Sequence, residues 1–249
     1  MLRGIERRLL ARARPWLDPW HHLDANVLEV RTFAHLKVAL GWTRDPVLEG
    51  AQLRSRPRLE DLNDRRLHDA QVIAGACANA ARRIALEIGT GHGFTTALMA
   101  ENAPHATVHT VNIPPEEIGA GGVHTTFAPT RDEIGREWRE RKLSNVVQIL
   151  ANTATWEPDF GPIDVAFIDG SHDAEFVFGD TRKVLARCRE GSLILLHDFH
   201  PGLRKAYPWI GAVCRGVERL YREGLLHGRI LHLQDSWVGL YRVPSGGAR

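Results

Sequence analysis

The sequence LEIGTGHGFT at residues 86–95 decides the fold of this chain. It joins an apolar run, 84–88, to three glycines at alternate positions, and a segment of helical character follows at 95–101. A buried parallel strand that runs through a tight turn into a helix forms the ligand-binding corner of an open α/β sheet. Glycine suits such a turn, because the backbone bends sharply there and a ligand can approach where no Cβ stands in the way.

The spacing of the glycines separates two classes of ligand. A dinucleotide-binding turn has the pattern G-x-G-x-x-G and holds a pyrophosphate at a helix N-terminus. Here the glycines are Gly89, Gly91 and Gly93, and Phe94 occupies the sixth position, so a pyrophosphate site is not indicated. With Glu87 two residues ahead, the stretch reads E-x-G-x-G-x-G. This pattern resembles motif I of the class I S-adenosylmethionine-dependent methyltransferases.

The resemblance implies how this corner binds its cofactor. In the family, the turn wraps the amino-acid end of S-adenosylmethionine, which assigns Gly89, Gly91 and Gly93 to cofactor binding. Glu87 is then expected to accept a hydrogen bond from the cofactor's ammonium group, directly or through water. Its alternative role is to hold the glycine turn by accepting backbone N–H groups, and the two roles are compatible.

Further cofactor contacts are expected after the next two strands. The family presents a carboxylate to the ribose hydroxyls about 20 residues beyond the turn, and this chain has Asn112 there. An amide can accept from one hydroxyl and donate to the other, without the added strength of a charge. The family holds the adenine edge after the third strand, where Asn152 and Thr153 match. Thr153 has a second interpretation as a helix-capping residue.

Strands and helices alternate along the rest of the chain. Strands are predicted at 84–88, 107–112, 146–150, 163–168 and 192–196, and helices at 67–81, 95–102, 131–142, 174–188 and 204–223. This alternation favours a parallel sheet with helices on both faces. Residues 229–233 and 237–243 read as a closing hairpin, which distinguishes the methyltransferase fold from the dinucleotide-binding one. We therefore predict an α/β fold: a Rossmann-like, doubly wound, mostly parallel seven-stranded sheet that ends in an antiparallel hairpin.

The N-terminal quarter is predicted to be a helical cap. Residues 1–66 show no strand alternation and are interrupted by prolines, while 67–249 form the S-adenosylmethionine-binding methyltransferase domain. Residues 1–14 are basic and amphipathic, and we expect a helix that packs on its own protein or on a partner, so a homo-oligomer is one alternative; a transit peptide and a membrane-surface helix are the others. Acceptor specificity is expected in the cap and in a glycine- and proline-bearing loop at 113–130.

Two strands end in polar residues that a purely structural strand does not need. One runs into Asp169 and His172, and the other runs into His197 and Asp198. If the two strands are parallel neighbours, both carboxylates reach one rim, where a magnesium ion could bind them together with water and substrate oxygens. Such a cation orients an acceptor hydroxyl and lowers its pKa. The alternative is that both aspartates position the acceptor without an ion.

The sequences FIDGSH at 167–172 and LLHDF at 195–199 resemble metal-dependent O-methyltransferases. They are closest to the branch that holds sugar and macrolide O-methyltransferases and cephalosporin-hydroxylase-like proteins. The resemblance implies catalytic roles for His172, as general base, and for Asp169, with Asp169 and Asp198 as metal ligands. Catechol-type enzymes have an Asn ligand where this chain has Phe199, which leaves His197 as the candidate third ligand. A histidine with a pKa near neutrality can take the hydroxyl proton as the methyl group transfers.

Composition sets the outer limits. A chain of 249 residues allows one sizeable α/β domain with an appendage, a net charge of +2 calls for no nucleic acid, and 3 cysteines are too few for a disulfide framework. The apolar runs are too short for a membrane span, and a cytoplasmic protein is expected.

The predicted function is methyl transfer from S-adenosylmethionine to an oxygen of a small hydroxylated acceptor, of sugar or natural-product type, with Mg²⁺ as an open alternative. Three alternative functions are an S-adenosylmethionine-binding protein without methyl transfer, a metal-free N-methyltransferase and a nicotinamide-dependent oxidoreductase. The glycine spacing and the hairpin argue against the oxidoreductase.

Overall fold

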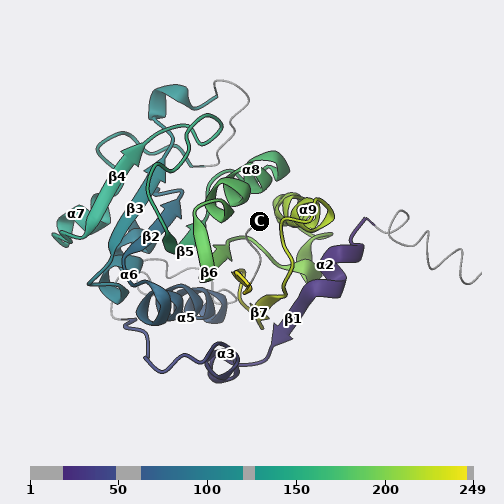
Figure 1. Cartoon of the computed structure of the whole chain (residues 1–249). Coiled ribbons are helices and arrows are strands. Elements are labelled where there is room, and N and C mark those ends of the chain that lie inside the picture. The colour runs from purple at the N-terminus through teal and green to yellow at the C-terminus, as the bar shows by residue number, and fades with distance from the viewer. Residues whose placement is uncertain (1–18, 49–62, 120–126, 246–249) are drawn as a thin grey trace, which may run out of the picture.

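The computed structural model describes residues 19–48, 63–119 and 127–245 (Figure 1). Within these ranges the chain forms one sheet, whose order is β1-β7-β8-β6-β5-β2-β3-β4. Neighbouring strands pair in parallel except at β8, which is antiparallel to both β6 and β7. The strands are β1 (Val27–Val30), β2 (Ile84–Ile88), β3 (Thr107–Asn112), β4 (Val146–Leu150), β5 (Ile163–Ile168), β6 (Cys188–Leu196), β7 (Ile230–Leu233) and β8 (Gly239–Arg242).

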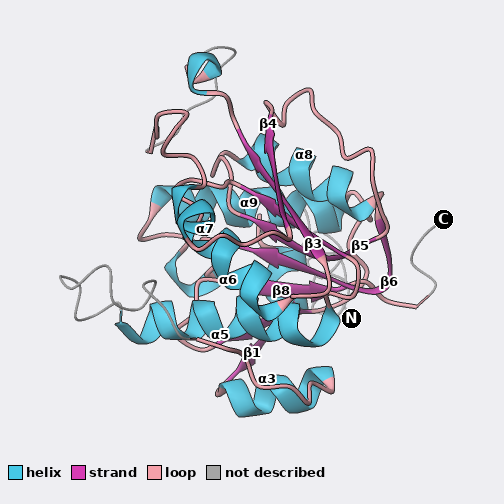
Figure 2. Cartoon of the chain, turned by 90° about the vertical axis from the view of Figure 1, so that its left-hand side faces the viewer, coloured by secondary structure: helices cyan, strands magenta, loops and turns pink. Residues whose placement is uncertain are grey.

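Helices cover both faces of this sheet (Figures 1 and 2). One face carries α3 (Phe33–Leu40), α5 (Asn63–Ala80) and α6 (Phe94–Asn102), with α7 (Arg136–Glu140) beside α6. The other face carries α2 (His21–Asn26), α8 (Ala174–Leu185) and α9 (Pro208–Arg222). Short 3-10 turns, η2 (Pro115–Glu117) and η4 (Pro201–Leu203), follow β3 and β6. In the described ranges, no helix is long and apolar enough to cross a membrane.

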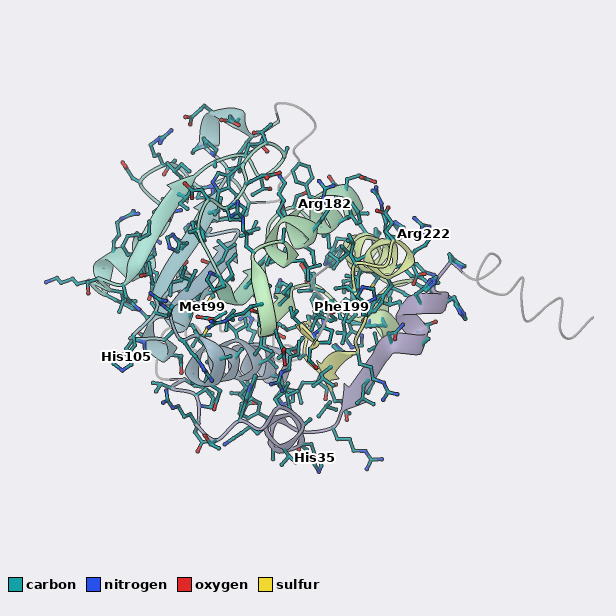
Figure 3. The ribbon with its side chains drawn as sticks, in the orientation of Figure 1. His35, Met99, His105, Arg182, Phe199 and Arg222 are labelled. Atoms are coloured by element: carbon teal, nitrogen blue, oxygen red, sulfur yellow. The ribbon has the colours of Figure 1, made fainter. Side chains whose placement is uncertain are left out.

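Two hydrophobic cores form because successive side chains of a strand point to opposite faces. Phe167 of β5 packs into the core beneath α5 and α6, whereas Ile168 packs into the core beneath α8 and α9. Both side chains are buried, and β5 and its neighbour β6 are apolar along the stretch where they pair. Figure 3 shows Met99 and Phe199 inside the molecule and His35 and Arg222 at its periphery. A strand that is buried on both faces explains the unbroken apolar runs in the sequence.

The structure confirms the predicted fold class, and most element boundaries agree within a few residues. The strands at 107–112 and 146–150 and the closing hairpin lie where they were predicted. Two helices differ. The segment 131–142 is mostly turns around the short α7, and the helix predicted from 204 begins only at Pro208, after the turn η4. Proline is favoured at the first position of a helix, which explains the later start.

The expectation of a purely helical cap and a seven-stranded sheet is corrected by β1. Residues Val27–Val30 add an eighth strand, parallel to β7, at the edge of the main sheet. The helices on either side of β1 also join the main cores, with Leu23 of α2 and Leu36 of α3 almost fully buried. The described part of the N-terminal quarter is therefore built into the sheet. The basic segment 1–14 lies outside the described residues, as do 49–62 and part of the 113–130 loop.

Candidate active site

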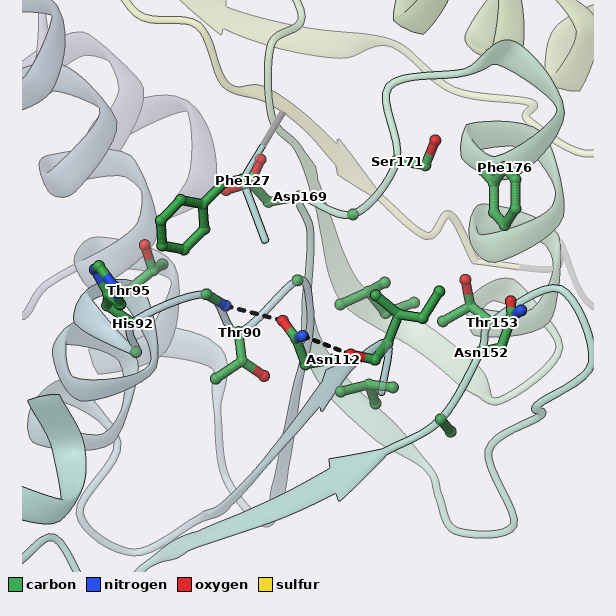
Figure 4. Close-up of a pocket in the computed structure, with 18 of the residues that line it drawn as sticks. Thr90, His92, Thr95, Asn112, Phe127, Asn152, Thr153, Asp169, Ser171 and Phe176 are labelled. Atoms are coloured by element: carbon green, nitrogen blue, oxygen red, sulfur yellow. Dashed lines mark hydrogen bonds between the residues drawn. The ribbon is translucent and has the colours of Figure 1, made fainter. Parts of the chain in front are cut away.

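The sheet order reverses between β2 and β5, and a cavity of about 330 Å³ opens at the carboxyl ends of the strands there. This is the place where open α/β sheets bind ligands. The side chains and backbone around it come from the ends of β2, β3, β4 and β5, from the start of α6 and from α8 (Figure 4). The lining includes the residues of the glycine turn, Asn112, Phe127, Asn152, Thr153, Asp169, His172 and Phe176.

The glycine turn forms the floor of the cavity and has little room for side chains. Gly89 has a φ of 104°, and a Cβ added to it would lie 2.0 Å from the carbonyl oxygen of Asp169. Gly93 has a φ of 84°, and its Cβ would lie 2.8 Å from the Cα of Gly135. Gly91 differs, since its nearest neighbour would be the Phe127 ring at 3.6 Å. The first and third glycines are thus required by the fold, whereas the second faces space that a ligand can use.

Glu87 is fully buried and is not among the described residues that line the cavity. Its Oε2 accepts hydrogen bonds from the hydroxyls of Thr96 and of Thr110, the latter at 2.6 Å, and its Oε1 has no partner among the described residues. Burial raises the pKa of Glu87 to about 8, although both hydroxyls act in the opposite direction. Glu87 therefore holds α6 to β3 through side chains, and among the described residues no backbone N–H of the turn donates to its carboxylate.

Asn112 lies at the cavity wall, as predicted, but its side-chain amide already makes hydrogen bonds to the protein backbone. Its Oδ1 accepts from the backbone N–H of Gly91 at 3.1 Å, and its Nδ2 donates to the carbonyl oxygen of Ile113 at 2.9 Å (Figure 4). An amide oxygen has two lone pairs and an NH₂ has two hydrogens, so each atom keeps one hydrogen-bonding position. The side chain can contact a ribose while it ties the glycine turn to β3.

Asn152 and Thr153 line the same cavity on the side of β4 (Figure 4). The Oδ1 of Asn152 accepts from the N–H of Ala154 at 2.9 Å, which forms a local turn. The Thr153 hydroxyl donates to Asp180 of α8 at 3.3 Å, and burial raises the pKa of Asp180 to about 6. Thr153 is therefore bound to a neighbouring helix and does not cap one.

The predicted polar residues at the ends of β5 and β6 do meet. The Nε2 of His172 lies 3.0 Å from Oδ2 of Asp198 and 3.9 Å from Oδ1 of Asp169. The Nδ1 of His197 lies 2.8 Å from Asp169 and 3.7 Å from Asp198, as an ion pair without the geometry of a hydrogen bond. Asp198 has a φ of 50°, a left-handed conformation that is rare for a residue other than glycine and is found more often at functional sites. We call Asp169, His172, His197 and Asp198 the Asp–His cluster.

Charge within the Asp–His cluster corrects one expectation. Asp169 and Asp198 raise the pKa of His172 to about 9. For His197, burial lowers the pKa, but the carboxylates of Asp169, Asp198 and Asp69 outweigh it and bring the value to about 10. His172 does not have the pKa near neutrality that was predicted, because two carboxylates lie beside it. The carboxylates thus favour the protonated form of both imidazoles.

The donor atoms of the Asp–His cluster fit a divalent cation. Asp169, His172 and Asp198 each offer one ligand atom, and these atoms all lie within 4.8 Å of one another. His172 thereby takes the place in this group that was predicted for His197, although His197 contacts the same carboxylates. Phe199 is fully buried against Gly239, so the position after the second aspartate supplies no ligand.

Sequence reasoning missed several residues of the site. Phe127 and His92 pack edge to face at 4.6 Å over the glycine turn, and Phe176 of α8 lines the opposite side of the cavity (Figure 4). Asp69 of α5 accepts from the hydroxyl of Ser236 and from the N–H of Trp237, both at 2.7 Å. Nothing in the sequence near Asp69 marks it, because its partners lie some 170 residues away and meet it only in the folded chain.

A comparison with protein families gives a match over the part of the chain that holds the cavity. Residues 86–199 match the model of a family described as a methyltransferase domain. The matched span begins in the strand before the glycine turn and ends just past the Asp–His cluster. This stretch, somewhat less than half of the chain, is therefore similar to a methyltransferase domain, and the sheet has the Rossmann-like methyltransferase fold.

Solved structures of methyltransferases share the fold at low sequence identity. One is the O-methyltransferase TomG from Streptomyces achromogenes, involved in tomaymycin synthesis, with 17% identity over 84% of this chain and 96% of that chain and a TM-score of 0.53. A proposed O-methyltransferase from Klebsiella pneumoniae shows 18% identity over 97% of both chains and a TM-score of 0.51. The N-methyltransferase NodS from Bradyrhizobium japonicum WM9 shows 13% identity over 75% of this chain and 98% of that chain, with a TM-score of 0.50. A comparison with curated proteins gave no significant match.

Proposed function

We propose that this protein transfers the methyl group of S-adenosylmethionine to a hydroxyl oxygen of a small-molecule acceptor. The observation that carries the proposal is the Asp–His cluster beside the cofactor cavity, since Asp169 and His172 belong to both. Methyl transfer from a sulfonium needs an acceptor atom held in line and, for a hydroxyl, a group that removes the proton. The cluster offers such a group next to the expected donor.

The roles divide along the rim. The glycine turn, Asn112, Asn152 and Thr153 hold the cofactor. Glu87 ties α6 to β3 through the hydroxyls of Thr96 and Thr110. His172 in its free-base form takes the proton from the acceptor hydroxyl at Nε2, while Asp169 and Asp198 orient the imidazole.

A divalent cation, if bound, would be held by Asp169, His172 and Asp198, and it would lower the pKa of the acceptor hydroxyl. In that case the imidazole is a ligand and is no longer available as the base. The two versions of the proposal therefore assign different work to His172, which makes them separable by experiment.

The first test is calorimetric titration with S-adenosylhomocysteine, with magnesium and again in a chelator. Micromolar binding in both conditions supports the cofactor pocket and limits any metal to the acceptor side. The absence of binding in both refutes the proposal at its first step. Binding without turnover of any hydroxylated acceptor favours a cofactor-binding protein that transfers no methyl group.

The second test is His172→Ala, which should abolish most turnover and leave the affinity for S-adenosylhomocysteine nearly intact. His105→Ala is the matched control, because it removes an exposed imidazole that does not line this cavity. Equal losses of turnover and cofactor affinity in His172→Ala would contradict its role in proton removal.

A further inference from the structure

Three aromatic side chains lie against one another: Tyr207 and Trp209, which are partly exposed, and Trp237, which is half-buried. The ring centroids of Tyr207 and Trp209 are 4.9 Å apart, and those of Tyr207 and Trp237 are 5.8 Å apart. Tyr207 is 37% exposed and Trp209 is 40% exposed. Among the described residues, the only other aromatic of comparable exposure is Phe127, which lines the cofactor cavity. We call Tyr207, Trp209 and Trp237 the aromatic platform.

Backbone connections place the platform at the reactive edge of the sheet. The N–H of Phe199, the residue after Asp198, donates to the carbonyl oxygen of Trp237 at 2.9 Å. The start of β8 pairs with the end of β6, at Gly239 and Leu196. Because α9 is the helix that follows β6, it begins at the carboxyl edge of the sheet, and Tyr207 and Trp209 flank its first residue.

The order of the strands fixes what lies between the cofactor and the platform. The cofactor cavity spans the ends of β4, β3, β2 and β5, the Asp–His cluster follows β5 and β6, and the platform lies beyond it at β8 and α9. An acceptor oxygen must approach the donor methyl at the cluster. The remainder of the acceptor then extends away from the cofactor, which is toward the platform.

Trp237 is held in place by buried polar groups. The backbone N–H of Trp237 donates to the carboxylate of Asp69. The same carboxylate accepts from the hydroxyl of Ser236, which is fully buried. The hydroxyl of Ser236 accepts in turn from the N–H of Val238 at 3.0 Å. A loop fixed in this way presents its aromatic residue without an ordering cost when a ligand binds.

We infer that the aromatic platform binds the ring of the methyl acceptor, and that this acceptor is a hydroxylated aromatic compound. This inference rests on the proposed function and narrows its substrate class. Aromatic rings pair in tilted and edge-to-face arrangements, and the rings of the platform already meet at 49° and 51°. A sugar needs hydrogen-bonding partners around its ring, whereas the three side chains supply only one hydroxyl and two indole N–H groups.

The test measures ring binding and cofactor binding separately. Full-length protein saturated with S-adenosylhomocysteine is titrated calorimetrically with 2,3-dihydroxynaphthalene and, in parallel, with methyl glucoside. We expect the naphthalenediol to bind and Trp209→Ala to weaken it about 2- to 10-fold, as for the loss of one aromatic pair. Trp209→Phe should retain most of the affinity. Val38→Ala, at an 82% exposed position of α3 on the opposite face, should change nothing.

Each outcome decides between the inference and the proposed function. Equal naphthalenediol binding by wild type and Trp209→Ala refutes the inference that the platform binds the acceptor ring. The inference is also refuted if methyl glucoside binding depends on Trp209 and naphthalenediol binding does not. If the melting temperature of Trp209→Ala falls, Tyr207→Ala serves as the second variant and is expected to weaken binding in the same range. Normal S-adenosylhomocysteine binding without ring binding overturns this inference alone, whereas failure of S-adenosylhomocysteine to bind the wild type overturns the proposed function as well.

Discussion

Replacing Gly89 by alanine should damage both the fold and the site. Its φ of 104° lies outside the conformations that L-residues adopt readily, which costs about 1–3 kcal/mol. The new Cβ would also lie 2.0 Å from the carbonyl oxygen of Asp169, and forcing an extra carbon into a packed place costs about 1–3 kcal/mol. Together these effects predict a loss of about 2–6 kcal/mol in the free energy of unfolding. Because the overlap is with Asp169, relief of the overlap also moves a residue of the Asp–His cluster.

The matched control is Gly91→Ala, two residues away in the same turn. Its φ of 51° is accessible to other residues at about 1–2 kcal/mol, and its Cβ would meet only the Phe127 ring at 3.6 Å. Urea unfolding of both variants and of wild type gives the three free energies, and an unchanged m-value shows that they are comparable. If Gly89→Ala lowers the free energy of unfolding no more than Gly91→Ala does, the close approach of the turn to Asp169 does not destabilise the variant, and the prediction is refuted.

Three further predictions concern other buried groups. Glu218→Ala should lower the free energy of unfolding by about 2–3 kcal/mol, because its carboxylate accepts from the N–H of Leu23 at 2.7 Å and holds α2 on α9; unchanged urea unfolding would contradict this. The raised pKa of Asp180, about 6 against an ordinary 3.8, means that the folded state loses stability as pH rises from about 4 to 6, since a buried carboxyl must ionise. Asp180→Asn should therefore gain up to about 3 kcal/mol over wild type at pH 7 but not at pH 4, and a gain that does not change with pH would show that ionisation is not its cause. Asp198→Asn should abolish any calorimetric signal for Mn²⁺ or Mg²⁺ that wild type gives, and retention of that signal would place the metal elsewhere.

The main body of the fold could be predicted because its strands are buried on both faces. Strands such as β5 and β6 lie between other strands and under helices, so their apolar runs stand out from the polar turns that bound them. The edge strand β1 carries no such pattern, since Leu28 and Glu29 are exposed and Val30 alone is buried. Its pairing with β7 depends on tertiary contacts, and tertiary context overrides local propensity most easily in short edge strands.

The location of the site could be predicted for a similar reason, but its internal contacts could not. Parallel strands bring their carboxyl ends to one edge, so Asp169 and Asp198 had to lie close together once β5 and β6 were known to be neighbours. Side-chain partners follow no such rule. The use of the Asn112 amide by Gly91, and the 3.0 Å contact of His172 with Asp198, arise between residues that no local sequence pattern relates.

The pairing of β1 with β7 also bears on how the chain reaches its folded state. Val27 pairs with Ile230, so one of the earliest described elements to leave the ribosome must wait about 200 residues for its partner. Contacts of such long sequence separation slow folding, and an unpaired strand is exposed to other chains in the meantime. Loss of β1 would leave β7 as an open sheet edge, and loss of β7 would leave β1 without its partner. The two ends of this chain are thus coupled in assembly, and the edge they share is where misassociation during synthesis should begin.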